Sequence, residues 1–278
     1  MLSQHKINAM LTEISSFLNR SSDRDLLGRS VVITDSGGAD GGFLVHHFIA
    51  QALRDGHITI LVSCAQSYTH YNSVGTKLGV SFSRHEEQGH LVFIDCLTKL
   101  TTQQQNGPTD EEVKGQTRHT FSLDSAFSLR GLYKLLHQCL LDVRRVKPDK
   151  PVCLVLDDLS VLVSVGVRLV EVVGLVHYCQ HMVTSTAHTA LGGGYMVTMV
   201  HCEGGGGCDE ETLGHHLAHK AHLSLHVEGL PSGYSRDVHG QVRAVWRDSL
   251  PVLRREAQFK LTDRTAHLFA KGTSSAVL

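Results

Sequence analysis

Residues 30–45 read SVVITDSGGADGGFLV, and this stretch decides the fold. The β-branched run at 30–34 predicts a short buried strand, and apolar residues recur at helical spacing over 43–53. A glycine-rich loop, residues 35–42, joins the two, and residues 58–62 predict a second strand after the helix. A strand, a glycine-rich loop and a helix in this order are typical of folds that hold phosphate at a helix N-terminus.

Strands and helices continue to alternate along the chain, which predicts an α/β fold with a mostly parallel sheet flanked by helices. The further predicted helices are 72–78, 125–146 and 165–182, and the further predicted strands are 90–94, 152–156 and 195–200. Three more strands, 222–228, 241–246 and 258–269, follow without predicted helices between them. We therefore expect antiparallel strands at the C-terminal edge of the sheet.

The domain organisation is expected to be simple. Residues 7–18 carry apolar side chains at helical spacing, so residues 1–28 are interpreted as an N-terminal helix and a connector. Residues 29–278 are expected to form one large domain, because no internal repeat or boundary divides them. Residues 101–119 are rich in Gln, Thr and Gly and lack periodicity, which predicts a flexible insertion in this domain.

The glycine-rich loop departs from the pattern that binds nucleotide phosphates, G-x-x-x-x-G-K-[S/T]. Gly37 and Gly42 have the required separation, but the next two residues are Phe43 and Leu44. The lysine that neutralises the outer phosphates and the hydroxyl that holds magnesium are therefore both absent. Asp40 adds a negative charge where phosphate would rest. The sequence predicts a degenerate loop with no nucleotide-binding residues.

An ATPase with a phosphate-binding loop of this kind also needs residues that hold magnesium and activate water, and these positions are altered as well. Asp157 and Asp158 end a predicted strand and resemble the acid that positions magnesium, but without a Lys-Ser/Thr pair we interpret them as capping acids. Gln66, after the second strand, cannot activate water as a glutamate would. A dinucleotide loop is excluded because the G-x-G-x-x-G register and the following acid are both missing. We expect no catalytic residues.

Composition indicates the cellular compartment and limits the kinds of partner that we expect. The formal net charge is -1, so no global charge attracts the chain to nucleic acid or to an anionic membrane. The 7 cysteines include no C-x-x-C pair, which indicates free thiols in a reducing compartment. Residues 1–16 are too polar for a signal peptide. We expect a cytoplasmic protein, with the nucleus as a second compartment, and no membrane partner.

Histidine is abundant, with 20 residues, and one cluster invites a metal hypothesis. His215, His219 and His222 would share one face of a helix, and that spacing can hold zinc. The cluster lacks the glutamate of H-E-x-x-H, and His222 begins a predicted strand, so we expect structural histidines, no metal and no cofactor. His46 and His47 follow the glycine-rich loop and are expected to be core or interface histidines.

Several stretches together resemble the Elongator complex protein 6 family, the sixth subunit of Elongator. The resemblance runs from about the first strand to the C-terminus, and the combination of motifs is specific. The matching stretches are FLVHHF at 43–48, QSYTHY at 66–71, VGTKLGVS at 74–81, DDLSVL at 157–162, HYC at 177–179, RDVHGQ at 236–241 and FAKG at 269–272.

The resemblance implies a RecA-like fold without working Walker motifs. It also implies a heterohexameric ring with the fourth and fifth Elongator subunits, docked on the catalytic subcomplex that modifies the wobble uridine, U34, of tRNA. The family's ring is thought to bind tRNA and to regulate its release through nucleotide. As tRNA contacts in this chain we single out Arg236, Arg243 and Arg247, from a predicted tail hairpin that would face the ring interior.

Two other hypotheses stay open from the residues alone. One is an ATPase subunit that completes a composite nucleotide site with a lysine or arginine from a neighbour. Replacing Phe43 and Leu44 with Lys and Ser should matter little if the site is abandoned. The other hypothesis is an interaction protein organised by zinc at residues 215–222, which metal analysis of purified protein would detect.

Overall fold

The computed structural model describes residues 12–18, 26–96, 118–123, 127–184, 193–202, 206–230, 233, 235–262 and 265–271. The strands are β1 (Ser30–Ser36), β2 (Ile58–Ser63), β3 (Leu91–Asp95), β4 (Arg118–Thr120), β5 (Val152–Asp157), β6 (Gly194–His201), β7 (Leu223–Glu228), β8 (Gly240–Trp246), β9 (Leu253–Leu261) and β10 (Ala266–Phe269). The helices are α2 (Gly42–Arg54), α3 (Tyr68–Lys77), α4 (Phe82–Glu87), α6 (Arg130–Val146), α7 (Leu159–Ser164), α8 (Leu169–Thr184) and α9 (Asp209–Lys220).

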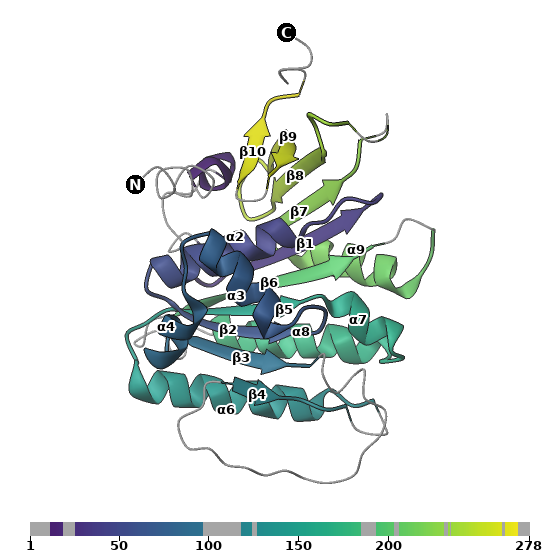
Figure 1. Ribbon diagram of the computed structural model, residues 1–278. Coiled ribbons are helices and arrows are strands. Elements are labelled where there is room, and N and C mark those ends of the chain that lie inside the picture. Colours follow the sequence, from purple (N-terminus) through teal and green to yellow (C-terminus); the bar gives the residue numbers. More distant parts are fainter. Residues whose placement is uncertain are drawn as a thin grey trace.

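The strands form one 10-stranded sheet in the order β10-β9-β8-β7-β1-β6-β5-β2-β3-β4 (Figure 1). From β7 to β4 the neighbouring strands run parallel, whereas β8, β9 and β10 pair antiparallel at one edge. The predicted parallel sheet with an antiparallel C-terminal edge is thus confirmed. Because β1 pairs with both β6 and β7, the glycine-rich loop leaves the sheet near its centre.

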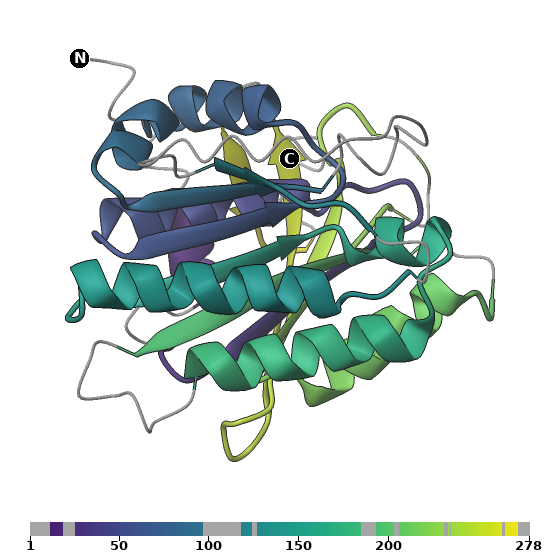
Figure 2. The same cartoon turned by 90° about the horizontal axis from the view of Figure 1, so that it is seen from below.

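Two apolar cores lie on opposite faces of the sheet, and Figure 2 shows α2, α3 and α4 on one side and α6, α8 and α9 on the other. Phe48 of α2 and Phe82 of α4 are buried in the first core, and Leu136 of α6 and Val172 of α8 in the second. Residues 12–17 are helical, as predicted for part of 7–18, and this helix joins the first core. No described helix is both long enough and apolar enough to cross a membrane.

Three predicted helices have wrong boundaries. The helix predicted at 72–78 is α3 and begins four residues earlier, where Ser67 caps it by accepting the His70 amide; the other two differ for a local backbone reason. The helix predicted at 125–146 begins at Arg130, because Phe127 adopts a left-handed φ of 51° and cannot continue a helix. Ser128 Oγ then accepts the Arg130 amide at 3.3 Å. The helix predicted at 165–182 is α8, which begins at Leu169, because Gly166 has a φ of 100° and separates it from α7.

The C-terminal strands and the predicted insertion also differ. The strand predicted at 258–269 is β9 and β10, because the backbone turns where the Thr262 amide donates to the Thr265 carbonyl at 2.8 Å. In the insertion predicted at 101–119, residues 118 and 119 belong to β4, and residues 101–117 lie outside the described residues. Helices α4, α7 and α9 were not predicted, although three acids in the first turn of α9 are a helix-start signal.

Candidate functional site

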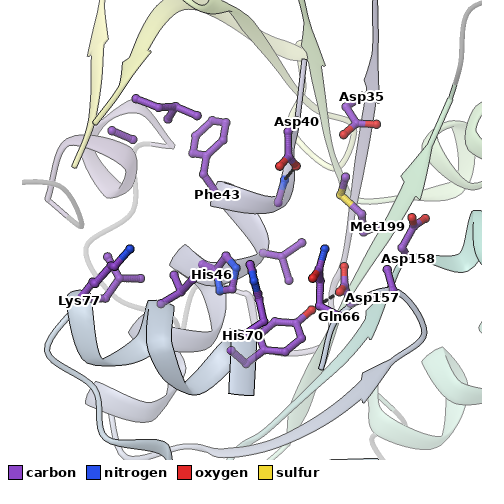
Figure 3. Close-up of a pocket in the computed structure, with 18 of the residues that line it drawn as sticks. Asp35, Asp40, Phe43, His46, Gln66, His70, Lys77, Asp157, Asp158 and Met199 are labelled. Carbon is purple, nitrogen blue, oxygen red and sulfur yellow. Dashed lines mark hydrogen bonds between the residues drawn. The ribbon is translucent and has the colours of Figure 1, made fainter. Parts of the chain in front are cut away.

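A cavity of about 470 Å³ opens at the carboxyl ends of β1, β5 and β6 (Figure 3). Asp35 is the last residue but one of β1, Asp157 ends β5 and is followed by Asp158, and His201 ends β6. All four line the cavity. The sheet order places β6 between β1 and β5, so these side chains meet although they are far apart in the sequence. Helices α2 and α3 supply the opposite wall, and residues at the β9–β10 turn complete the rim.

The glycine-rich loop fills its own anion-binding position. The Gly41 amide donates to Asp35 Oδ2 at 2.8 Å, and the Gly42 amide donates to Asp40 Oδ1 at 2.7 Å. Amides at the start of a helix have no partner within the helix, and in phosphate-binding loops they point at the phosphate. Here two carboxylates of the same chain accept them, so negative charge already complements the N-terminus of α2.

The two positions after the loop are used for packing. Phe43 lies against Phe259 of β9 with 5.0 Å between ring centroids, and Leu44 is 0% exposed. A serine at position 44 would remove core packing as well as change the chemistry of the loop. The double replacement of Phe43 and Leu44 is therefore not a clean test of an abandoned site, contrary to the expectation from sequence.

Asp35 is fully buried at the base of this loop. Burial raises its pKa, while the Gly41 amide and His201 act in the opposite direction. His201 Nδ1 lies 2.5 Å from Asp35 Oδ1, so the two side chains form one hydrogen-bonded unit. His201 was missed in the sequence. Its signal was its place directly after the predicted strand 195–200, because ligand sites of open α/β sheets lie at the carboxyl ends of the strands.

Asp157 and Asp158 differ in role although they are adjacent. Asp158 Oδ1 accepts the Ser160 amide at 3.1 Å and caps α7, which agrees with the capping interpretation. Asp157 is buried and accepts a hydrogen bond from the hydroxyl of Tyr71 in α3. Burial raises the pKa of Asp157 to about 6, so near neutral pH it is a carboxylate held in a poorly solvated place.

Two histidines stand on the helical wall of the cavity (Figure 3). The His46 ring in α2 lies with its centroid 5.5 Å from that of His70 and 5.1 Å from that of Tyr71. Desolvation lowers the pKa of His46 to about 4, with a smaller contribution from His70, so His46 is neutral near pH 7. A neutral imidazole has one nitrogen that accepts a hydrogen bond. Gln66 is exposed at the rim of the cavity.

The cavity therefore combines an acidic floor with a largely apolar wall. Lys77 is the one lysine or arginine among the described lining residues, and it lies across the cavity from the acids (Figure 3). Carboxylates without a neighbouring cation repel phosphates and attract cations and hydrogen-bond donors. In the described ranges no group of three or more His, Cys, Asp or Glu side chains is arranged to hold a metal ion.

The arginines predicted to contact tRNA lie away from this cavity, on or near β8. Arg243 forms ion pairs with Glu256 at 2.7 Å and with Glu228 at 3.4 Å. Arg247 donates to Ser224 Oγ at 2.7 Å. Arg236 precedes the strand and is exposed, and the part of the chain that the structure describes contains no ion pair with it. Arg243 thus lies within β8, whereas Arg247 follows the strand directly and Arg236 lies in the segment before it.

The histidines at 215–222 do not share one helix face, because α9 ends before His222. The helix ends at Lys220, so His222 lies beyond it, and its Nδ1 accepts the Ser30 amide at 3.1 Å. His215 Nε2 lies 3.8 Å from Glu211 Oε1 on the same helix. Within the described residues these side chains converge on no common point, so the geometry does not assemble the zinc site considered from the sequence.

Two solved structures from Pyrococcus horikoshii share this architecture. An uncharacterised protein in complex with an unknown peptide matches with a TM-score of 0.65 and 10% identity, over 94% of this chain and 98% of its own. A KaiC-like protein matches with a TM-score of 0.51 and 12% identity, over 87% of this chain and 90% of its own. At such identities the likeness shows the fold alone, and it agrees with the RecA-like α/β fold that the family resemblance implied.

Sequence similarity then defines the family within that fold. The family model described as Elongation complex protein 6 matches residues 11–263. Elongator complex protein 6 of Danio rerio is 36% identical over 276 residues, and that of Homo sapiens is 37% identical over 281 residues. Each alignment covers 97% of this chain and 100% of the relative. The chain belongs to the Elongator complex protein 6 family, as its motifs indicated.

Proposed function

We propose that this chain is a non-catalytic structural and regulatory subunit of Elongator. It forms a heterohexameric RecA-like ring with the fourth and fifth Elongator subunits, with residues 29–278 as its single ring-forming domain. The ring binds tRNA, docks on the catalytic Elongator subcomplex and supports modification of the wobble uridine U34. It acts in the cytoplasm and in the nucleus.

The observation that carries the proposal is the pairing of the loop amides with the chain's own carboxylates. A subunit that hydrolyses ATP needs these amides and a lysine for the phosphates. Here Asp35 and Asp40 accept the amides of Gly41 and Gly42, and Phe43 stands where the lysine would be. The degenerate loop therefore supports an accessory role rather than ATP turnover, and family membership supplies the assembly in which that role is exercised.

Exposed apolar side chains support the proposal that this chain functions as part of an assembly. On α8, Val170 is 67% exposed and Tyr178 is 61% exposed, and Leu250 in the β8–β9 turn is 97% exposed. Large apolar side chains that gather on a surface commonly mark contacts with other proteins. A ring built from related subunits gives each one two neighbours, and so provides partners for both surfaces.

Binding of tRNA must come from a local patch, because the net charge is -1. We propose Arg236, Arg243 and Arg247 as the contacts in this chain. Arg236 is exposed, whereas Arg243 already neutralises two glutamates and Arg247 donates to a serine. Of the three, Arg236 is expected to contribute most to phosphate binding.

Co-expression with the fourth and fifth Elongator subunits of the same organism tests the proposal directly. The expected result is a ternary species with the mass of a hexamer in native mass spectrometry, and retention of labelled tRNA by that species. The matched control is co-expression of the two partners without this chain. A chain that purifies alone and associates with neither partner would contradict the proposed function.

A further inference from the structure

The turn between β8 and β9 carries four consecutive apolar residues that face solvent, here called the apolar tip. The four are Leu250, Pro251, Val252 and Leu253. Leu250 is 97% exposed, Val252 is 44% exposed and Leu253 is 37% exposed. Figure 2 shows this yellow-green turn projecting beyond the helices on the side of α8 and α9. A run of exposed apolar residues adds nothing to the core and promotes association, so in natural proteins it marks a contact surface.

The residues at the base of the apolar tip hold it in a defined conformation. Ser249 Oγ donates to the Trp246 carbonyl at 3.1 Å and accepts the Leu253 amide at 3.0 Å. Trp246 packs against the first core, and Asp248 forms an ion pair with Arg29 at 2.6 Å. A turn that is already ordered loses little conformational entropy when it binds, so these contacts favour a binding role for the tip.

The segment around the apolar tip is cationic. Asp248 is the one acid in residues 246–255, and Arg29 neutralises it. Arg254 is exposed, and the described ranges contain no ion pair with it. Burial lowers the pKa of Arg247, and the charge of the nearby Arg254 lowers it further. Positive charge without a neighbouring carboxylate, placed beside an apolar surface, suits a partner whose apolar surface is bordered by acids.

We propose that the apolar tip inserts into an apolar pocket, rimmed by aspartate or glutamate, on another subunit of the Elongator assembly. Leu250 is the anchor in this pocket, and Arg254 pairs with a carboxylate at its rim. The inference rests on the proposed function, because it takes the partner from that assembly. The partner is a protein rather than RNA, because the tip contains no aromatic ring on which a base can stack.

Substitution of an exposed side chain tests the inference without disturbing the core. Leu250→Ser removes the anchor, and Val146→Ser, at an exposed residue that ends α6, is the matched control. Arg254→Glu reverses the charge beside the tip, and Lys150→Glu, at an exposed lysine in the turn before β5, is its control. Titration measures two affinities, that of the full chain for the fourth and fifth subunits and that of the assembled ring for the catalytic subcomplex.

Leu250→Ser should weaken one of these affinities about tenfold to a hundredfold, because the burial of a leucine side chain is lost. Arg254→Glu should weaken the same affinity at low salt and have a smaller effect at high salt. Both controls should bind as wild type does. If the ring forms and Leu250→Ser changes neither affinity, the inference is wrong while the proposed function stands. If the wild-type chain joins neither the fourth nor the fifth subunit, both are wrong.

Three further measurements detect a different occupant of the apolar tip, and each positive result would overturn the inference. In sedimentation of the isolated chain, a dimer that Leu250→Ser converts to a monomer would assign the tip to a second copy of this chain. In flotation with vesicles of phosphatidylcholine and phosphatidylserine, binding that Leu250→Ser abolishes would assign it to a lipid surface. In a titration of the assembled ring with labelled tRNA, weaker binding by Leu250→Ser at unchanged subunit affinities would assign it to RNA.

A photo-crosslinking amino acid at position 250 locates the pocket in the reconstituted assembly. The cross-links are expected on one partner subunit, at apolar residues that have an aspartate or glutamate beside them. Cross-links to a surface without carboxylates would contradict the charge complementarity on which the inference depends.

Discussion

Replacement of Asp157 by asparagine should stabilise this protein, although it removes a buried, hydrogen-bonded side chain. Asp157 is 6% exposed, and burial raises its pKa from 3.8 to about 6. Because the folded state binds this proton more tightly than the unfolded state does, the favourable contribution of the group is lost as the pH rises through about 6. Asparagine keeps an acceptor for the Tyr71 hydroxyl and carries no charge to desolvate.

The size of the effect follows from the shift. A difference of roughly 2 pKa units corresponds to about 3 kcal/mol between the two protonation states. Asp157→Asn should therefore gain up to about 3 kcal/mol in the free energy of unfolding near pH 7.5, and roughly 1 kcal/mol near pH 4.5, where the wild-type carboxyl is mostly protonated. The change of about 2 kcal/mol between the two pH values is the informative quantity, because any steric cost of asparagine cancels in it.

Urea unfolding followed by circular dichroism at both pH values measures this quantity from the midpoints. The matched control, Asp149→Asn, removes the same charge from an exposed position and should change stability by less than about 0.5 kcal/mol. A variant that is equally destabilised at both pH values would refute the reasoning, because it would mean that the Asp157 carboxylate is not held against desolvation.

Three further predictions concern the loop, the sheet and the arginines. Phe43→Lys should give no ATP hydrolysis above background in a phosphate-release assay, because the first amides of α2 stay paired with carboxylates; measurable turnover would restore the composite-ATPase hypothesis. Gly240→Ala should lower the free energy of unfolding by about 1–3 kcal/mol in a thermal melt, since its Cβ would lie 2.5 Å from a β7 carbonyl oxygen. The control Gly174→Ala, on α8 with open space around it, should raise the free energy of unfolding by about 0.5–1 kcal/mol. Equal effects of the two variants would contradict the packing. In the assembled ring, Arg236→Ala should weaken tRNA binding and reduce the slope of log affinity against log salt concentration by about one, and Arg243→Ala should have the smaller effect. A filter-binding titration measures both variants, and the reverse order would exclude Arg236 as the main contact.

The central sheet was predictable because of how its strands are buried. A parallel strand covered by helices on both faces is rich in apolar and β-branched residues along its whole length, and β1, β2 and β5 are buried on both faces in this way. The errors in the boundaries of α6 and α8 came from the backbone angles of single residues. Nothing in the sequence around Phe127 indicates a left-handed residue. Gly166 lies in an apolar stretch, so the sequence pattern places the start of α8 at residue 165, before this glycine. The turn between β9 and β10 depends on hydrogen bonds that Thr262 and Thr265 make across four residues.

The candidate site was predictable only in part. The missing lysine and hydroxyl after Gly42 are visible in the sequence, as is the negative charge of Asp40. The role of Asp35 is not visible, because it depends on the loop bending back to place the Gly41 amide against its carboxylate. The contact between Asp35 and His201 joins residues 166 positions apart and exists only because β6 lies beside β1 in the sheet.

The measurement that tests the central claim most directly is the binding of Mg-ATP to the purified chain by isothermal titration calorimetry. The chain's own carboxylates occupy the amides that would hold phosphate, and the acidic floor repels the nucleotide. We therefore predict no saturable binding up to about 1 mM nucleotide, which corresponds to a binding free energy weaker than about -4 kcal/mol. Saturable binding with a micromolar Kd, lost on replacement of a residue lining the cavity, would contradict the account.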